Sequence, residues 1–346
     1  MAAATLSRTR TADRDPRERL VALLADGEFH SGAGLGRELG VSRTAVWKAL
    51  RRLEELGVEV HAVPKRGYRF ALPVEELNRE AIGSALSAAL RRRVRTLERF
   101  FTVESTNSHL LARDDLPPGR TDVCVAEVQT AGRGRRGRTW NAPFGGSIVL
   151  SMSWQFPDVP RQLSALSLAV GVGVLRALKD CGDTLRLKWP NDVLFAGRKV
   201  GGILIELRAE FSGPAYVVVG VGLNHRLSPA ARRALDAAGA DATDLHEVAT
   251  KAMRKLPGRN RIVAALITEI AAVLEAFQQE GLKPFAREWR SADALAATAA
   301  RVAYGEEIYR GIARGIDEEG ALLLETPGRL LRFTSGEVTV RSEPRS

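Results

Sequence analysis

Four arginines and three glycines are concentrated between Gly132 and Trp140, in the stretch GRGRRGRTW. Arginine offers planar pairs of N–H donors that match carboxylate and phosphate oxygens, and glycine lets backbone amides approach a bound anion closely. The glycine spacing also matches G-x-G-x-x-G, the fingerprint of a dinucleotide-binding turn. The stretch could therefore be a Rossmann turn, a nucleic-acid patch, or a loop that closes over an anionic small molecule.

The residues that follow the glycines argue against a Rossmann turn. Such a turn needs a strand before the glycines and a helix after them. The apolar stretch 123–128 supplies the strand, but Pro143, Gly145 and Gly146 stand where the helix should run. Only about ten residues separate Gly137 from the next apolar stretch, which is too few for a crossover helix.

The composition of the stretch favours a small anionic ligand over a nucleic acid. It has the charge of a nucleic-acid patch, but Trp140 is the only aromatic residue beside the arginines and the pattern is not repeated. An empty loop with this charge repels itself, so it should become ordered when an anion binds. We therefore expect an active-site lid, with a nucleic-acid patch as the alternative. The arginines are Arg133, Arg135, Arg136 and Arg138.

Three further polar motifs lie at the ends of predicted strands. KWPNDV places Asn191 and Asp192 after a strand, GRKVGGILIE places Lys199 ahead of two glycines, and GVGLN ends a strand in Asn224. The glycine pair indicates that another group packs against bare backbone. Lys199 could also be only a charge at a hairpin tip. Together the motifs predict one ligand cleft lined by strand ends.

Strands and helices alternate around these motifs and predict a central domain of roughly 200 residues. A polar hinge at about 72–82 precedes it. The last part of the chain has short strands separated by Gly, Pro and Asp turns, which predicts a small β-barrel. The predicted strands span 123–128, 147–154, 185–189, 200–207 and 215–223, and the predicted helices span 163–180 and 261–282.

The N-terminal part predicts a winged helix-turn-helix. Its third helix begins after the N-cap candidate Ser42 and carries an apolar stripe that includes Val46 and Leu50. Two short strands follow around Pro64, as in a wing. An excess of four positive charges between residues 43 and 69 predicts DNA binding, although a basic face can also be merely solvated. The expected DNA-contacting residues are Arg43, Thr44, Trp47, Lys48, Arg51, Lys65 and Arg66.

The whole composition narrows the protein class. The net charge of +10 favours a polyanionic partner or anionic substrates. Cys124 and Cys181 are the only cysteines, which excludes a disulfide framework and favours a reducing cytoplasm. No apolar run reaches the roughly 18 residues of a membrane span, and the N-terminus lacks the apolar core of a signal peptide. We expect a cytoplasmic protein with no membrane partner, whose residues 1–15 form a disordered tail.

Five motifs follow the helix-turn-helix in order: ESTN, GRGRRGRTW, KWPND, GRKVGGILIE and GVGLN. In this order they resemble the bifunctional biotin–protein ligase/biotin operon repressor family, from about residue 17 to Arg341. The resemblance implies a multidomain α+β fold. Its parts would be a winged helix-turn-helix domain at 16–78, a central α/β catalytic domain of the biotin/lipoate ligase type at 79–296, and a small SH3-like β-barrel at 297–346.

The resemblance also implies a reaction in two steps. Biotin and ATP, with Mg²⁺, would give biotinyl-5′-adenylate and pyrophosphate, and the adenylate would then acylate a lysine of a biotin carboxyl carrier protein. The first step brings a carboxylate against a phosphate, so two anions must be held together. Arginines and a lysine meet that need without a nucleophilic side chain.

Residue roles follow from the motif positions in this resemblance. Trp140 would stack on adenine, and Lys199, Arg135 and Arg133 would act in catalysis. Ser105 and Thr106 could instead only cap a helix, and Asn107 could serve a turn. The biotin site would comprise Ser105, Thr106, Asn107, Gln129, Arg133, Gly134, Arg135 and Lys199. The ATP site would comprise Arg138, Trp140, Asn191, Asn224 and Arg341, and no metal-ligating residue is predicted.

The resemblance further implies regulation by the adenylate. The loaded protein would form a homodimer through central-domain sheets that join edge to edge, and the dimer would bind a palindromic operator of biotin genes. The basic segment 225–261 matches none of the motifs, and no role is predicted for it. The alternatives are a ligase whose winged helix is not regulatory, a lipoyl or octanoyl ligase, and a biotin-sensing transcription factor without turnover.

Overall fold

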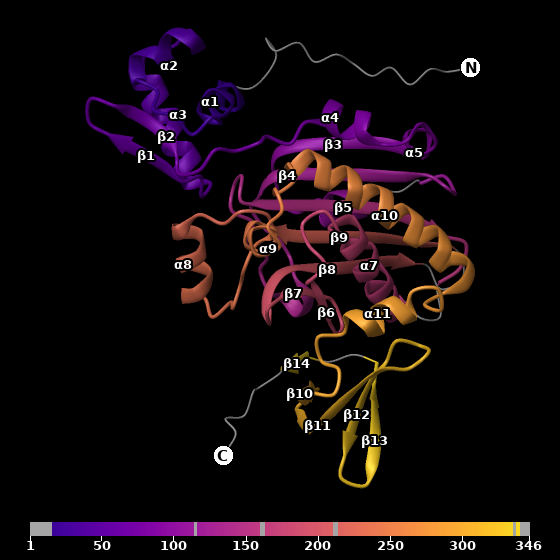
Figure 1. Cartoon of the computed structure of the whole chain (residues 1–346). Coiled ribbons are helices and arrows are strands. Elements are labelled where there is room, and N and C mark those ends of the chain that lie inside the picture. Colours follow the sequence, from indigo (N-terminus) through magenta and orange to yellow (C-terminus); the bar gives the residue numbers. More distant parts are fainter. Residues whose placement is uncertain (1–15, 114–115, 160–162, 210–213, 335–336, 340–346) are drawn as a thin grey trace, which may run out of the picture. The chain divides into compact units, whose positions relative to one another are not determined.

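The computed structural model describes residues 16–113, 116–159, 163–209, 214–334 and 337–339 (Figure 1). The chain forms two compact units. The first contains Met1–Glu76 and Pro143–Gly145, and the second contains Leu77–Ala142 and Gly146–Ser346. The tail predicted at residues 1–15 lies outside the described residues.

The first unit is a winged helix-turn-helix, as predicted. Ser42 caps its third helix by accepting a hydrogen bond from the Ala45 amide, and Val46 and Leu50 on that helix are buried. A Cβ on Gly67 would lie 2.1 Å from the His30 carbonyl oxygen, so the wing needs glycine there. The elements are α1 (Pro16–Leu24), α2 (Gly32–Leu39), α3 (Arg43–Glu55), β1 (Val60–Val63) and β2 (Gly67–Phe70).

The second unit is built on a seven-stranded sheet of described residues, in the order β3–β4–β5–β9–β8–β7–β6. The β3–β4 pair is parallel and the other pairs are antiparallel. The five strands predicted for this domain are all present. The strands are β3 (Val94–Val103), β4 (Thr121–Gln129), β5 (Ser147–Phe156), β6 (Arg186–Lys188), β7 (Asp192–Phe195), β8 (Arg198–Ala209) and β9 (Ala215–Asn224).

Helices cover both faces of this sheet. Val123 and Val125 of β4 face the core beneath α7 and α10, whereas Cys124 packs with Leu110 of α6 on the other face. Burial on both faces explains why the strands are almost continuously apolar. The helices are α4 (Arg79–Ala85), α5 (Ala88–Arg93), α6 (Thr106–Leu111), α7 (Leu163–Ala177), α8 (Pro229–Ala237), α9 (Leu245–Lys251), α10 (Arg259–Glu280) and α11 (Ala286–Ala292).

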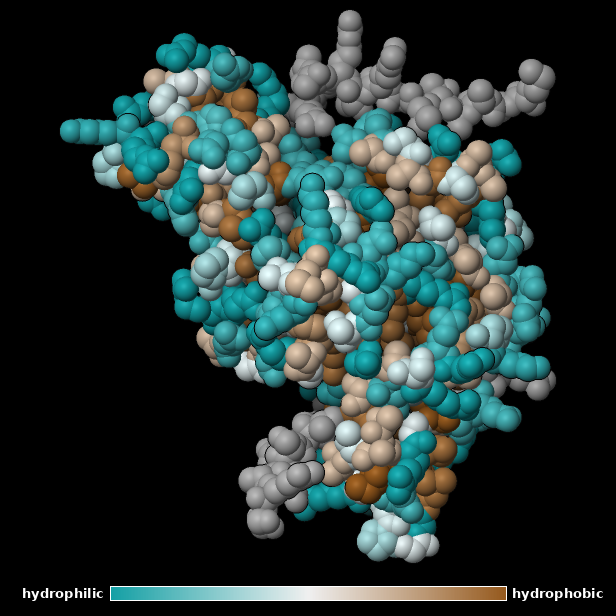
Figure 2. Space-filling model, in the orientation of Figure 1, coloured by the Kyte–Doolittle hydropathy of each residue, from teal (hydrophilic) through white to brown (hydrophobic). Residues whose placement is uncertain are grey.

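Helix α10 has the length and apolar composition of a membrane-spanning helix. More than half of it is buried inside the protein, and it packs against α7, α4 and β5. Hydrophilic residues predominate on the molecular face shown in Figure 2. The apolar character of α10 is therefore explained by its place in the core.

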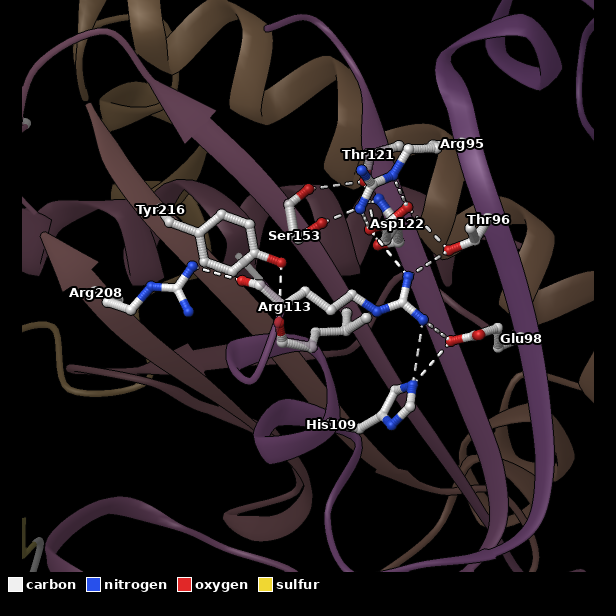
Figure 3. A network of polar contacts seen from close by, with 11 residues as sticks. Arg95, Thr96, Glu98, His109, Arg113, Thr121, Asp122, Ser153, Arg208 and Tyr216 are labelled. Atoms are coloured by element: carbon white, nitrogen blue, oxygen red, sulfur yellow. Dashed lines mark hydrogen bonds and ion pairs between the residues drawn. The ribbon is translucent and has the colours of Figure 1, made fainter. Parts of the chain in front are cut away.

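A buried carboxylate joins the edge strand β3 to the rest of the sheet (Figure 3). Asp122 on β4 is fully buried and accepts hydrogen bonds from Arg95 Nε (2.9 Å) and Thr96 Oγ1 (2.9 Å), and Arg113 Nη1 lies 3.0 Å away. Burial acts to raise the pKa of Asp122, but these bonds hold that pKa below its usual value. We call the set Arg95, Thr96, Glu98, His109, Arg113 and Asp122 the Asp122 network.

The C-terminal part forms a separate five-stranded antiparallel sheet of described residues, in the order β13–β12–β11–β10–β14. This arrangement agrees with the small β-domain that the turn-rich sequence predicts. Trp189 Nε1 donates a hydrogen bond to the Gly320 carbonyl oxygen (3.0 Å), which links the two sheets. The strands are β10 (Ala299–Tyr304), β11 (Glu307–Ile316), β12 (Leu322–Thr326), β13 (Arg329–Phe333) and β14 (Glu337–Thr339).

Candidate active site

The arginine-glycine stretch forms a tight hairpin between β4 and β5, which we call the arginine lid (residues 132–140). The Trp140 amide donates to the Gly132 carbonyl oxygen (2.9 Å), and the Gly134 amide donates to the Arg138 carbonyl oxygen (2.7 Å). A Cβ on Gly132 would lie 2.4 Å from the Trp140 carbonyl oxygen, so the hairpin closes too tightly for any other residue there. No helix lies between the lid and β5, and the Rossmann interpretation is excluded.

A cavity of about 700 Å³ opens beside the arginine lid, within the size range of small-molecule sites. We call it the ligand cavity. Polar residues at strand ends line it, as the motifs predicted, together with Val338 of β14. Arg341 lies outside the described residues. Every other predicted biotin- or ATP-site residue lines the cavity: Ser105, Thr106, Asn107, Gln129, Arg133, Gly134, Arg135, Arg138, Trp140, Asn191, Lys199 and Asn224.

A cluster of short polar contacts lies along one wall of the ligand cavity. Thr106 donates to Gln129 Oε1 through its amide (2.8 Å) and its hydroxyl (3.1 Å). Ser151 Oγ lies 2.7 Å from Thr106 Oγ1 and 2.5 Å from Asn107 Oδ1. Ser151 has one hydroxyl hydrogen for these two acceptors. Hydroxyl and amide oxygens each carry two lone pairs, so the oxygens of this cluster can also accept hydrogen bonds from the N–H groups of a ligand.

Helix α6 presents two of these residues. Ser105 is its N-cap and accepts from the Ser108 amide (3.4 Å), so capping is one role of Ser105, as the alternative interpretation supposed. Thr106 and Asn107 are nearly fully buried within hydrogen bonds that run across the sheet. They do more than cap a helix or shape a turn. Ser151, on β5, was not predicted, because a lone serine in an apolar strand gives no signal in the sequence.

Lys199 lies inside the ligand cavity, two residues beyond the hairpin glycine at position 197. Its Nζ is 2.6 Å from Asp192 Oδ1 and 5.7 Å from the centre of the Trp140 ring. A Cβ on Gly202 would lie 3.4 Å from Nζ, so the lysine side chain packs along bare backbone, as the glycine pair predicted. The hairpin-tip interpretation of Lys199 is therefore wrong.

Trp140 lies against the backbone of β9. A Cβ on Gly222 would come within 2.5 Å of the indole ring, so the ring packs directly on the glycine. Its Nε1 is buried and has no hydrogen-bond partner among the described residues. The indole thus presents an aromatic surface and an unused donor at the ligand cavity.

The segment for which the sequence predicted no role forms another wall of the ligand cavity. The Lys199 amide donates to the Asp241 carbonyl oxygen (2.8 Å), and the Thr243 amide donates to the Lys199 carbonyl oxygen (2.8 Å). Asn224 Nδ2 donates to the Thr243 carbonyl oxygen (2.9 Å). The lining residues from this segment are Leu235, Ala238, Gly239, Ala240, Asp241 and Ala242. Its position depends on backbone pairing with distant residues, which sequence periodicity does not reveal.

The predicted DNA-contacting residues lie together on the winged-helix unit. Arg43, Thr44, Trp47, Lys48 and Arg51 are exposed on α3, and the Arg51 guanidinium lies 5.5 Å from the Trp47 ring centre. Lys65 and Arg66 are exposed at the tip of the wing, where Arg66 stacks 4.2 Å from the Phe29 ring centre. The sequence did not single out Phe29. Basic side chains therefore occupy both elements that meet DNA in this class of domain.

Three family models match the chain in succession. An HTH domain matches residues 17–69, the biotin/lipoate A/B protein ligase family matches residues 101–224, and the biotin protein ligase C terminal domain matches residues 301–341. The matched regions contain the winged helix, the arginine lid with most of the ligand cavity, and the C-terminal sheet. They and the site geometry define a protein ligase of the biotin/lipoate type.

Two individual proteins are similar to the chain, one over nearly its whole length and one over about two thirds of it. The bifunctional ligase/repressor BirA of Escherichia coli (strain K12) is 39% identical over 326 residues, which cover 94% of this chain and 97% of that protein. The biotin–[acetyl-CoA-carboxylase] ligase of Mycobacterium tuberculosis is 38% identical over 244 residues, 68% of this chain and 85% of that protein. The chain belongs to the bifunctional biotin ligase/repressor family, and it is a biotin–[acetyl-CoA-carboxylase] ligase with a repressor's DNA-binding domain.

A solved structure agrees with this assignment. The biotin protein ligase from Aquifex aeolicus in complex with biotin and ATP superposes with a TM-score of 0.56 at 28% identity. The match covers 72% of this chain and 99% of that chain.

Proposed function

We propose that the ligand cavity joins biotin to ATP and that the polar cluster of Thr106, Asn107, Gln129 and Ser151 binds the biotin ring. The ureido group of biotin carries two N–H donors and one carbonyl acceptor. Its N–H groups can donate to the remaining lone pairs on the oxygens of the cluster. This match separates biotin from lipoic and octanoic acids, which have no N–H groups.

The proposal for the first step rests on the position of Lys199. Its ammonium lies in the cavity near the ring of Trp140, with Arg133 and Arg135 of the arginine lid lining the same space. The biotin carboxylate attacks the α-phosphorus of ATP, and pyrophosphate leaves. The three cations reduce the repulsion between the two anions and stabilise the charge that develops on the phosphoryl oxygens.

Five residues are assigned to the nucleotide end. Trp140 stacks on adenine and Arg138 contacts the phosphates. Asn191 acts through Arg135, whose Nη1 donates to its Oδ1 (3.4 Å), while its own Nδ2 donates to the Ile203 carbonyl oxygen (2.8 Å). Asn224 supports the wall at Thr243. Arg341, which lies outside the described residues, is assigned to the phosphates from its place in the sequence motif alone.

Magnesium fits this site as a companion of ATP. Among the described residues, no group of three or more His, Cys, Asp or Glu side chains is placed to hold a metal ion. Mg²⁺ in ATP sites keeps phosphate and water ligands and needs few from the protein. Asp192 is the carboxylate that could supply one. The ion would neutralise phosphate charge during adenylation.

In the second step, a lysine amine of a biotin carboxyl carrier protein attacks the acyl carbon of the adenylate. AMP leaves, and an amide bond remains. The arginine lid holds the adenylate until the carrier arrives. Burial raises the pKa of the two thiols, Cys124 to about 12 and Cys181 to about 11, so neither thiol is a reactive nucleophile in this mechanism.

The free edge of β8 supports a homodimer. Strand β7 pairs with β8 only as far as Gly202, so the described residues beyond Ile203 have β9 on one side and no strand on the other. Two copies of such an edge can extend their sheets into one. A dimer would present two winged helices to a palindromic operator of biotin genes.

Two measurements test the proposal. Pyrophosphate release with ATP should require biotin, and neither lipoate nor octanoate should replace it; release with either acid would refute the biotin assignment. In a gel-shift assay on the promoter of the biotin genes, retardation should increase when biotin and ATP are both present. A protein that ligates biotin but shifts no promoter would be a ligase with a non-regulatory winged helix.

A further inference from the structure

One carboxylate connects the polar cluster to the arginine lid. Glu206 on β8 accepts a hydrogen bond from Asn107 Nδ2 at its Oε2 (2.8 Å), and its Oε1 is paired with Arg133 Nη2 (2.6 Å). Asn107 belongs to the wall of the ligand cavity and Arg133 to the lid. The two carboxylate oxygens of Glu206 therefore bind residues of two different elements, one in the cavity wall and one in the lid.

The Asn107 end of this connection is rigid. A Cβ on Gly220 would lie 2.2 Å from Asn107 Oδ1, so the amide lies directly on the β9 backbone. Its Oδ1 is 2.5 Å from Ser151 Oγ, and its Nδ2 also reaches the Leu204 carbonyl oxygen (3.3 Å). Glu206 is therefore held in place by a group that cannot turn without breaking several contacts.

The Arg133 end belongs to a region with excess positive charge. A second cavity of about 700 Å³ lies under the lid, lined by Thr130–Thr139 together with Leu204 and Glu206. Glu206 is the only acid among the described residues that line it. Four lid arginines and one carboxylate, paired with Arg133, therefore line this cavity, and removing the negative charge should loosen the lid.

We propose that Glu206 is a positioning residue that fixes the arginine lid through Arg133 and thereby sets how long the adenylate stays bound. The inference rests on the proposed adenylation site. The contact with Glu206 engages Nη2 of Arg133, so other guanidinium N–H groups can bind the acyl phosphate at the same time. The pair is partly exposed, with 44% of the Arg133 side chain and 23% of the Glu206 side chain accessible, so its effect on overall stability is small.

The substitution Glu206→Gln tests this role because it keeps the shape and removes the charge. The measurement is the rate at which biotinyl-adenylate leaves a preformed complex, chased with excess unlabelled biotin. We expect release to accelerate about tenfold, the effect of losing one charge-assisted hydrogen bond. The rate of adenylate formation at saturating biotin and ATP should fall by a smaller factor than release accelerates, since Lys199 and Arg135 are untouched and Arg133 keeps its charge. Glu206→Asp should restore part of the retention.

Arg208→Gln is the matched control for a merely structural effect. Arg208 lies two residues further along β8 and donates to the Leu111 carbonyl oxygen (2.8 Å) at the other end of α6. The Arg208→Gln variant should have a lower melting temperature and an unchanged rate of adenylate release. If Glu206→Gln behaves in the same way, or leaves release unchanged, Glu206 does not position the lid.

The pair Arg133→Gln and Glu206→Gln supplies a second, independent test. If Glu206 acts through Arg133, the double variant should release adenylate no faster than Arg133→Gln alone. Additive accelerations would overturn the inference. If the wild-type protein forms no adenylate from biotin and ATP, the proposed function itself fails, which is a different outcome from unchanged release.

Discussion

Two polar networks meet helix α6 at its two ends, and each centres on a carboxylate. In the Asp122 network the carboxylate is fully buried, and both of its oxygens have partners within the chain. At the other end, Glu206 is partly exposed, one of its two partners belongs to the arginine lid, and the neighbouring polar cluster lines the ligand cavity. A network closed within the protein interior contributes to the fold, whereas one that opens on a cavity can also bind a ligand.

The comparison predicts that substitutions at the two ends of α6 separate into two classes. Changes in the Asp122 network should lower stability and leave the chemistry of the folded protein nearly intact. Changes around the ligand cavity should impair the chemistry and cost little stability. The cations there repel one another when no ligand is bound, so removing one of them also relieves repulsion.

The largest effect is expected from Lys199→Ala. The substitution removes an ammonium from the cavity in which the two anions react, and adenylate formation should fall about 10³-fold, as for the loss of one preorganised oxyanion donor. The melting temperature should change little, because the Lys199–Asp192 pair is partly exposed, with 37% and 22% of the two side chains accessible. Pyrophosphate release checks the rate; near wild-type values would remove Lys199 from the mechanism.

Asp122→Asn should give the complementary result. It leaves Arg95 and Arg113 beside a neutral amide, and unfolding should become easier by about 3 kcal/mol, the low end for a broken buried pair because the arginines are partly exposed. Since the folded pKa of Asp122 is lowered, this stability is present at neutral pH and is lost as pH falls through that pKa. Urea unfolding measures it. A variant with normal stability but defective adenylation would contradict the division between the networks.

The sequence predicted the elements with strong periodicity and missed those defined by distant partners. Helix α3 and strands β4, β5, β8 and β9 are long and apolar enough to be recognised. Strand β3 was missed because charged residues of the Asp122 network interrupt its apolar pattern. Helices α8, α9 and α11 and strand β7 are short and were also missed.

The candidate site shows the same division. Residues in the motifs line the ligand cavity as expected, because glycines and clustered charges at strand ends mark them. Ser151 lies inside an ordinary apolar strand, and Glu206 ends the motif GRKVGGILIE without being singled out; only the sheet register brings both beside α6. The wall formed by Leu235 and Ala238–Ala242 depends on a loop that pairs with Lys199. Such contacts depend on the fold and cannot be read from local sequence.

A third carboxylate, Asp293, sharpens the comparison because one of its oxygens has no partner among the described residues. Burial raises its pKa to about 6, while the Leu295 amide acts to lower it. The pKa of Asp293 is higher in the folded than in the unfolded state. Its contribution to the free energy of unfolding is therefore complete below the unfolded pKa of about 4 and is lost as pH rises through 6. This is opposite in sign to Asp122.

Asp293→Asn should remove that pH dependence. The free energy of unfolding of the wild type, relative to the variant, should fall by roughly 2 kcal/mol between pH 4 and pH 7. Urea titrations of both proteins at several pH values measure this difference. A difference that stays constant with pH would show that Asp293 does not titrate in this range.

The smallest effect is expected from substitutions in the arginine lid, where the position of each guanidinium matters more than the total charge. Arg135→Gly removes the guanidinium that reaches Asn191 and loosens the turn, so biotinyl-adenylate should leave the site about tenfold faster. Arg136→Gly is the matched control, because Arg136 already has a φ of 56°, a conformation that glycine adopts without strain. It removes the same charge but should retain adenylate better than Arg135→Gly. Equal leakage from the two variants would show that the lid acts through total charge and that the contact with Asn191 has no separate role.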